Sequence, residues 1–198
     1  MKIYLGWGAF LEHCEFLLPD ISLAIEKETG EPLEVQFDYS DKELLGEFPD
    51  EYLYALKRVG AHIQKSGKLP ETSFVEDLLD EEIDEVLAEY IDKYKKGFKF
   101  GSLIFFSETL GVYLPVKGLE DPIHFEHEEK NIEICSIGSL YALKKDLQEL
   151  KNLLEEKRKD NSNEEVPWHI ELQVVDKLLQ YTERAIKEKK PLLLMGED

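Results

Sequence analysis

The sequence predicts an α+β fold: an antiparallel sheet from two hairpins, packed against several amphipathic helices, with a C-terminal αα-hairpin. Segments rich in β-branched and aromatic residues lie together between residues 98 and 135, separated by turn residues. Apolar residues recur at helical spacing on both sides of that region. A chain of 198 residues suits one domain, so we expect a single α+β domain over residues 1–198, with a boundary near residues 96–101 as the alternative.

The first forty residues predict two strands separated by two helices. Met1–Leu5 has the composition of a short strand, and the apolar residues after it repeat at helical spacing up to Pro19. Asp20 is suited to begin a second short helix, which Gly30 ends. Leu33–Tyr39 alternates apolar and polar side chains, which is the pattern of a half-buried strand.

Two further helices are expected in the next part of the chain. Pro49, with acidic residues directly after it, predicts the start of a helix that stops near Gly67. A second, acidic helix is expected to begin at a capping box formed by Ser73 and Glu76 and to end before Gly97.

The remaining residues predict the two hairpins and the αα-hairpin. The first β-hairpin is expected within residues 98–116, and the second pairs residues 123–127 with residues 132–135. Leucines repeat at helical spacing over residues 140–154, and apolar residues do so again over residues 172–186, with a polar connection between the two stretches. A closing strand is predicted at Leu192–Met195.

The composition limits the kinds of partner that we expect. The chain has 43 acidic and 24 basic residues and a formal charge of −19, so it should repel nucleic-acid backbones and anionic membranes. We therefore expect no nucleic acid and no membrane among its partners. Its two cysteines, Cys14 and Cys135, are too few for a disulfide framework, and no segment approaches the ~20 apolar residues of a membrane span. These features predict a cytoplasmic protein.

The acidic helix is the most distinctive feature of the sequence. Ten carboxylates and no Lys or Arg occur between Glu71 and Asp92. One interpretation is a solvated face that keeps the protein soluble, as charge runs commonly do. The other is a docking face that attracts a basic protein surface. The predicted partner-binding residues on that face are Asp77, Glu81, Asp84, Glu85 and Glu89.

A second candidate site lies around the second hairpin. The turn that contains Ser136, Gly138 and Ser139 links a strand to a helix, where backbone N–H groups can hold an anion. His124 and Glu126 share one face of the preceding strand. The simpler alternative is that Ser136 or Ser139 caps the following helix. The turn has one Gly and no Lys, so it matches neither the phosphate-loop nor the dinucleotide pattern.

These observations favour a soluble, acidic protein-binding module without catalysis. Its concrete form is an immunity-type inhibitor that engages a basic partner surface through the acidic helix. The alternative is an enzyme that binds a small molecule or phosphate through residues 124–139. No catalytic motif is present, so we expect no catalytic residues, no cofactor and no metal. The oligomeric state and the identity of the partner stay open.

Overall fold

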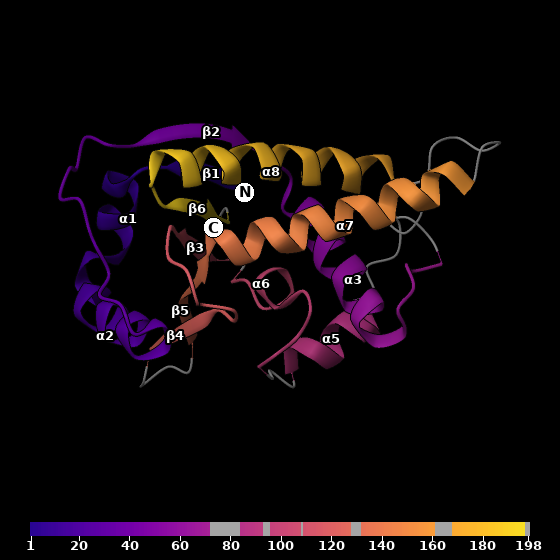
Figure 1. Cartoon of the computed structure of the whole chain (residues 1–198), viewed down its shortest axis with the longest axis horizontal. Helices are drawn as coiled ribbons and strands as arrows, with labels where there is room; N and C mark the ends of the chain where they lie inside the picture. The colour runs from indigo at the N-terminus through magenta and orange to yellow at the C-terminus, as the bar shows by residue number, and fades with distance from the viewer. Residues whose placement is uncertain (72–83, 93–95, 108, 128–131, 161–167, 197–198) are drawn as a thin grey trace.

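A computed structural model describes residues 1–71, 84–92, 96–107, 109–127, 132–160 and 168–196. Figure 1 shows a sheet with helices packed on both of its faces. The strands are β1 (Lys2–Leu5), β2 (Glu43–Glu47), β3 (Leu110–Leu114), β4 (Ile123–His127), β5 (Ile132–Ser139) and β6 (Leu192–Met195). The helices are α1 (Trp7–Cys14), the 3₁₀ helix η1 (Glu15–Leu17), α2 (Leu18–Thr29), α3 (Asp50–Ser66), α5 (Glu85–Asp92), α6 (Gly101–Ile104), α7 (Leu140–Asp160) and α8 (His169–Glu188).

The six strands form one sheet in the order β2-β1-β6-β3-β5-β4. The last strand in the chain, β6, lies inside the sheet and pairs antiparallel with both β1 and β3. The pairing of β3 with β5 is parallel, with Gly111 opposite Ser136, whereas β4 and β5 form an antiparallel hairpin. The α+β prediction is confirmed, as are the second hairpin and the closing strand, but the sheet is mixed rather than antiparallel.

Two predicted strand segments were wrong. Residues 98–116 do not form a hairpin, because Gly101–Ile104 is helical and Leu103 and Ile104 are buried in the core. Leu33–Tyr39 is irregular, and the strand of this region is β2, a few residues farther along the chain, which pairs with β1 on the side opposite β6. Residues 98–116 suggest strands by their β-branched and aromatic content, and Leu33–Tyr39 does so by its alternation of apolar and polar side chains. In both places tertiary packing overrides the local preference.

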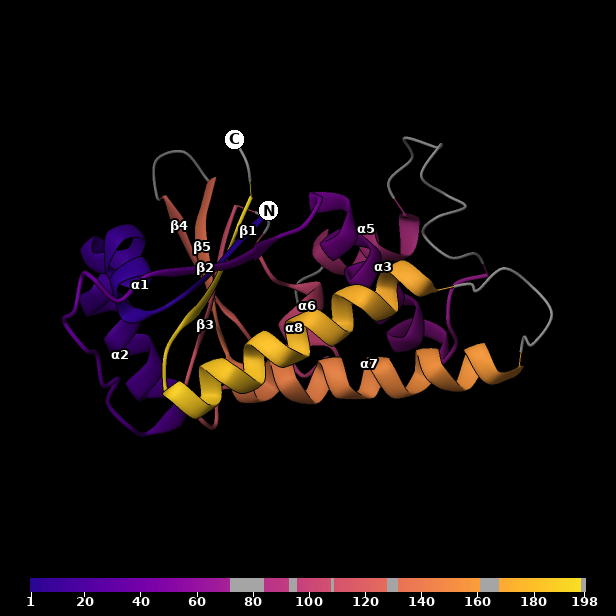
Figure 2. The same ribbon diagram turned by 90° about the horizontal axis from the view of Figure 1, so that it is seen from above.

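The helices form two layers, one on each face of the sheet (Figure 2). On one face α3, α6, α7 and α8 bury a large core against side chains such as Leu5, Tyr113 and Leu192. On the other face α1 and α2 cover Val112, Ile137 and Leu193. The predicted αα-hairpin is α7 and α8, and the predicted helix after Pro49 is α3, which ends at the left-handed Gly67. The segment from α1 to β2 is therefore the outer layer on the second face.

Candidate protein-binding surface

The net charge is concentrated in two segments of the chain. Residues 71–92 contribute −10, as the sequence analysis noted. Residues 12–51 hold thirteen carboxylates and two lysines, Lys27 and Lys42, and contribute −11. The two segments sum to −21 against a total of −19, so all other residues together carry +2. Any strongly negative surface must therefore come from one or both of these segments.

Part of the predicted acidic helix lies outside the described residues, and the prediction is wrong at Asp84, which precedes a helix instead of lying within one. Asp77 and Glu81 lie outside the described residues, and the described helix is α5, Glu85–Asp92. Glu85 and Glu89 are exposed on α5, and Lys65 of α3 donates to Glu89 at 3.0 Å. The docking role of Glu85 and Glu89 stays a prediction.

Asp84 has an internal function in the fold. Its carboxylate accepts hydrogen bonds from the Leu87 N–H at 2.9 Å and from Arg58 Nε at 2.8 Å, and it lies 2.9 Å from His62 Nε2. Burial raises the pKa of Asp84, but these three partners outweigh burial and hold the pKa below its ordinary value. Asp84 thus caps α5 and ties it to α3.

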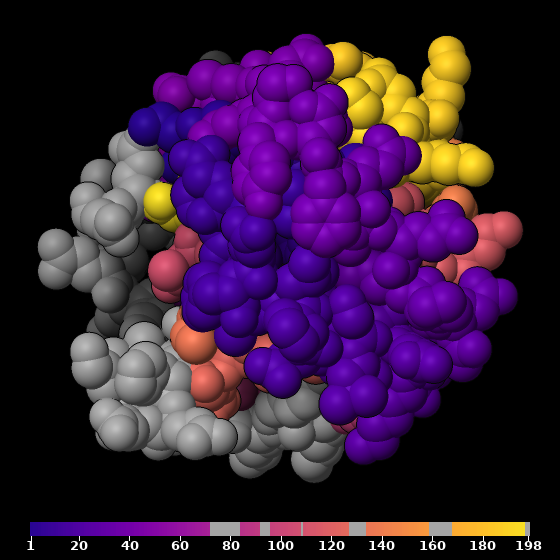
Figure 3. All heavy atoms as spheres, turned by 90° about the vertical axis from the view of Figure 1, so that its left-hand side faces the viewer, coloured from indigo at the N-terminus to yellow at the C-terminus, as the bar shows by residue number. Residues whose placement is uncertain are grey.

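The first acidic segment covers the outside of the α1 and α2 layer. In Figure 3 the N-terminal residues, indigo and purple, form most of the side of the molecule that faces the viewer. Five of the thirteen carboxylates are ion-paired: Glu12, Glu28, Asp41, Glu43 and Asp50. Six exposed ones, located between α1 and β2, are in no ion pair with a described residue, and we name them the acidic face: Glu15, Asp20, Glu26, Glu31, Glu34 and Asp38.

Exposed apolar side chains accompany the acidic face. Among the described residues, six large hydrophobic side chains are strongly exposed, and five of them belong to residues 16–44: Phe16, Leu23, Phe37, Tyr39 and Leu44. Leu23 lies on the exposed side of α2, with Asp20 one turn before it and Glu26 one turn after it. Exposed apolar side chains surrounded by charged ones are typical of protein–protein contact surfaces.

The predicted anion turn is part of the sheet. Ser136 and Gly138 lie in β5, where the Ser136 hydroxyl accepts a hydrogen bond from the Ser107 N–H at 2.8 Å. A Cβ atom at Gly138 would lie 2.9 Å from the ring of Tyr113, so glycine makes room for that ring. Ser139 caps α7, because its hydroxyl accepts from the Tyr141 N–H at 3.1 Å. The capping alternative for Ser139 is therefore confirmed.

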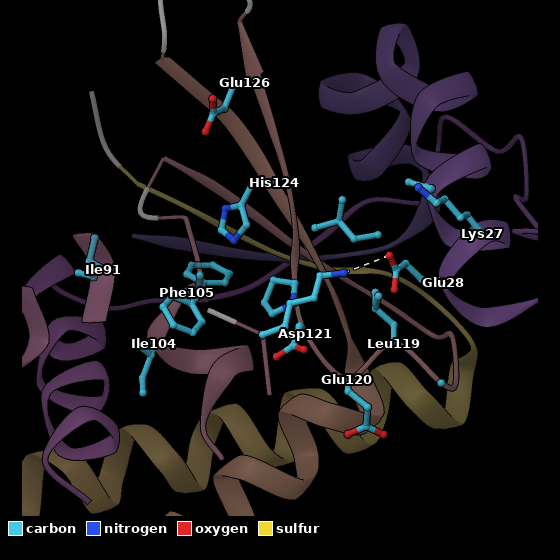
Figure 4. Close-up of a pocket in the computed structure, with 16 residues that line it drawn as sticks. Lys27, Glu28, Ile91, Ile104, Phe105, Leu119, Glu120, Asp121, His124 and Glu126 are labelled. Carbon is cyan, nitrogen blue, oxygen red and sulfur yellow. Dashed lines mark hydrogen bonds and ion pairs between the residues drawn. The ribbon is translucent and has the colours of Figure 1, made fainter. Parts of the chain in front are cut away.

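His124 and Glu126 line a pocket of about 760 Å³ at the edge strand β4. Figure 4 shows His124 on β4 and Glu126 farther along the same strand. Lys96 and Glu28 both line this pocket, and Lys96 Nζ lies 3.1 Å from Glu28 Oε1. This ion pair connects α2 to the segment that follows α5. His124 lies directly opposite Ser136 in the pairing of β4 with β5, but Ser136 and Ser139 are buried and do not line the pocket. A ligand for the pocket stays a prediction.

Two other kinds of site are absent from the part of the chain that the structure describes. No group of three or more His, Cys, Asp or Glu side chains there has the arrangement of a metal site. No described helix is both long enough and apolar enough to cross a membrane.

Comparison with known proteins identifies the family. A family model described as "Putative DNA-mimic protein" matches residues 17–194, which is most of the chain. No curated protein and no solved structure matches. The match corrects the expectation of a basic protein surface as partner with no nucleic acid involved, because a DNA mimic implies a partner that binds DNA. The chain is an acidic protein-binding module and belongs to this DNA-mimic family.

Proposed function

We propose that the protein binds a DNA-binding protein at the surface that otherwise contacts DNA, and that the acidic face makes the contact. The observation that carries this proposal is the charge of −11 on residues 12–51, most of which form the α1 and α2 layer and the loop that follows it. Six exposed carboxylates of that layer have no ion-pair partner among the described residues. They are therefore available to cations of a partner.

The size of the charge supports mimicry of a DNA segment. Duplex DNA carries one negative charge per ~1.7 Å of its axis, so a charge of −19 equals that of roughly 32 Å of duplex, or about one helical turn. The field of such a charge attracts a cationic surface and accelerates encounter. A protein of this charge and size can thus compete electrostatically for a DNA-binding surface.

In its more specific form, the function is inhibition of the immunity type. The partner would be a toxin or nuclease that acts on DNA, and occupation of its DNA site would block its activity. A cytoplasmic location agrees with this role, since the inhibitor must reach its partner before the partner reaches DNA. A nuclease assay in which added DNA restores activity would support this form of the proposal.

The test is displacement from immobilised DNA. DNA-binding proteins of a source-cell extract are retained on a matrix that carries both native and denatured DNA, and the pure protein is added at constant salt. We expect it to release a small set of proteins. A variant with Asp20→Asn, Glu26→Gln, Glu31→Gln and Glu34→Gln should need about tenfold more protein for the same release, a loss of about 1.4 kcal/mol.

Two controls make the result specific. A second variant carries Asp77→Asn, Glu81→Gln, Glu85→Gln and Glu89→Gln, and its net charge changes by the same amount as that of the first variant. If this second variant impairs release less than the first, the acidic face is the docking surface. If it impairs release more than the first, the docking residues are instead the acidic ones at positions 77–89. Polyglutamate at matched charge tests for a general polyanion effect. If polyglutamate releases the same proteins equally well, the proposal is wrong.

A further inference from the structure

Three aromatic rings are exposed within the acidic face. Phe16, Phe37 and Tyr39 expose 68%, 66% and 58% of their surface, whereas residues of this size are ordinarily packed inside a domain. None of the three rings contacts another ring of a described residue. Their faces are consequently open to a partner.

The rings and carboxylates form one local cluster. The Tyr39 hydroxyl donates to Glu15 Oε1 at 2.6 Å, which brings the loop after α2 against η1. Phe16 follows Glu15 in η1, and Asp38 separates Phe37 from Tyr39. We name these five residues the ring–carboxylate cluster: Glu15, Phe16, Phe37, Asp38 and Tyr39.

The backbone of the loop that carries this cluster is fixed. The Asp38 N–H donates to the Gln36 carbonyl at 3.0 Å, the pattern of a γ-turn centred on Phe37. Farther on, the Gly8 N–H of α1 donates to the Asp41 carbonyl at 2.8 Å. A Cβ atom at Gly8 would lie only 2.6 Å from the Tyr39 carbonyl oxygen, so the loop lies directly on α1. The rings are thus presented on an ordered support, which reduces the entropy lost on binding.

The chemistry of this cluster differs from that of a DNA duplex. A duplex presents phosphates outside and keeps its base faces stacked inside, so carboxylates alone can imitate its exterior. A single strand exposes both its phosphates and the flat faces of its bases. Proteins that bind single strands combine a basic groove with aromatic side chains on which bases stack, each stack contributing ~1–3 kcal/mol. Flat rings alternating with carboxylates offer the same two groups as a single strand.

We propose that the ring–carboxylate cluster imitates single-stranded DNA and that the partner is a single-strand-binding protein with aromatic stacking platforms. Carboxylates take the place of phosphates, and the rings of Phe16, Phe37 and Tyr39 take the place of bases. This inference rests on the proposed function and specifies the class of partner.

The experiment separates the two DNA forms. Equal portions of the source-cell extract are loaded on immobilised single-stranded DNA and on immobilised duplex DNA, and the pure protein is titrated into both. We expect release from single-stranded DNA at a concentration at least about tenfold lower than from duplex DNA. A variant with Phe16→Leu, Phe37→Leu and Tyr39→Leu keeps apolar area and charge but lacks flat rings, and it should lose at least about tenfold in release from single-stranded DNA.

Matched variants keep the outcome interpretable. The change Ile91→Ser removes exposed apolar surface on α5, outside the acidic face, and this variant should release protein as the unchanged chain does. Thermal melting checks that each variant is folded. Release from duplex DNA alone, or full activity of the leucine variant, would overturn single-strand mimicry and leave the proposed function standing. If the protein releases nothing from either DNA form, both single-strand mimicry and the proposed function are wrong.

Discussion

Asp146 shows how one buried group sets the pH dependence of stability. It lies in α7 and is buried, hydrogen-bonded to the hydroxyl of Ser102, whose carbonyl accepts from the Tyr113 hydroxyl at 2.6 Å. Burial raises the pKa of Asp146 from 3.8 to about 7, although the hydrogen bonds with Ser102 oppose the rise. The folded state therefore binds a proton that the unfolded chain releases above pH ~4.

This raised pKa predicts lower stability at higher pH. The contribution of Asp146 is fully present below the unfolded pKa of 3.8 and is lost as the pH rises through 7. Between pH 5 and pH 8 the loss should be about 3 kcal/mol, at 1.36 kcal/mol per pH unit. Asp146→Asn keeps a group that can bond to Ser102 and should remove this part of the pH dependence. Urea unfolding at pH 5 and pH 8 measures the free energy of unfolding of the unchanged protein and of the Asp146→Asn variant. If stability changes with pH to the same extent in both, Asp146 is not the group responsible.

At the scale of elements, single hydrogen-bonding residues fix where helices begin. The Ser139 hydroxyl accepts from the Tyr141 N–H and donates to the Val116 carbonyl at 2.6 Å, so it joins the start of α7 to the segment after β3. Ser139→Ala should lower the free energy of unfolding by about 2 kcal/mol, from the lost cap and the unpaired carbonyl. The control is Ser22→Ala on α2, which should change the free energy of unfolding by less than about 0.5 kcal/mol. An equal effect of both substitutions in urea unfolding would exclude a capping role.

The junction of α3 and α5 is held by Asp84. Tyr54, Arg58 and His62 follow one another at helical spacing on α3, and the Tyr54 hydroxyl accepts from the Asp84 N–H at 2.7 Å. The lowered pKa of Asp84 gives stability that is present above pH ~4 and is lost as the pH falls through the folded pKa. The substitution Asp84→Asn should lower the free energy of unfolding by roughly 2 kcal/mol at pH 7. The control is Glu85→Gln at the next residue, which is exposed, and it should leave the free energy of unfolding almost unchanged. Equal losses of stability for the two variants in thermal unfolding would refute the internal role of Asp84.

The elements that sequence patterns predicted correctly have clear end signals. α3 begins after Pro49 and ends at Gly67, and the sequence between β4 and β5, residues 128–131, is wholly polar. The short helix α6 was missed because six of residues 98–106 are aromatic or large aliphatic residues, and such a short apolar segment does not distinguish a buried helix from a strand. The parallel pairing of β3 and β5 was also not predictable, since no local signal gives the direction of a non-local neighbour.

The candidate surface was only partly predictable at the scale of the whole molecule. The charge of residues 12–51 is visible as a count over a forty-residue window, but two lysines interrupt it, and the uninterrupted run at residues 71–92 is more conspicuous. The exposure of Phe16, Phe37 and Tyr39 has no sequence signal, because such residues usually belong to a core. Only the fold shows that the helices α1 and α2 use other side chains for packing, such as Phe10 and Ile21.

The most direct test of DNA mimicry is a competition measurement with a purified partner, recovered by release from immobilised DNA. Its apparent dissociation constant for labelled DNA is measured at rising concentrations of the acidic protein. If the two ligands share one surface, this constant rises in proportion to the concentration of the acidic protein, without a limit. A constant that levels off would show that DNA and the acidic protein bind together at different surfaces, and an unchanged constant would show no competition. Either result would contradict mimicry.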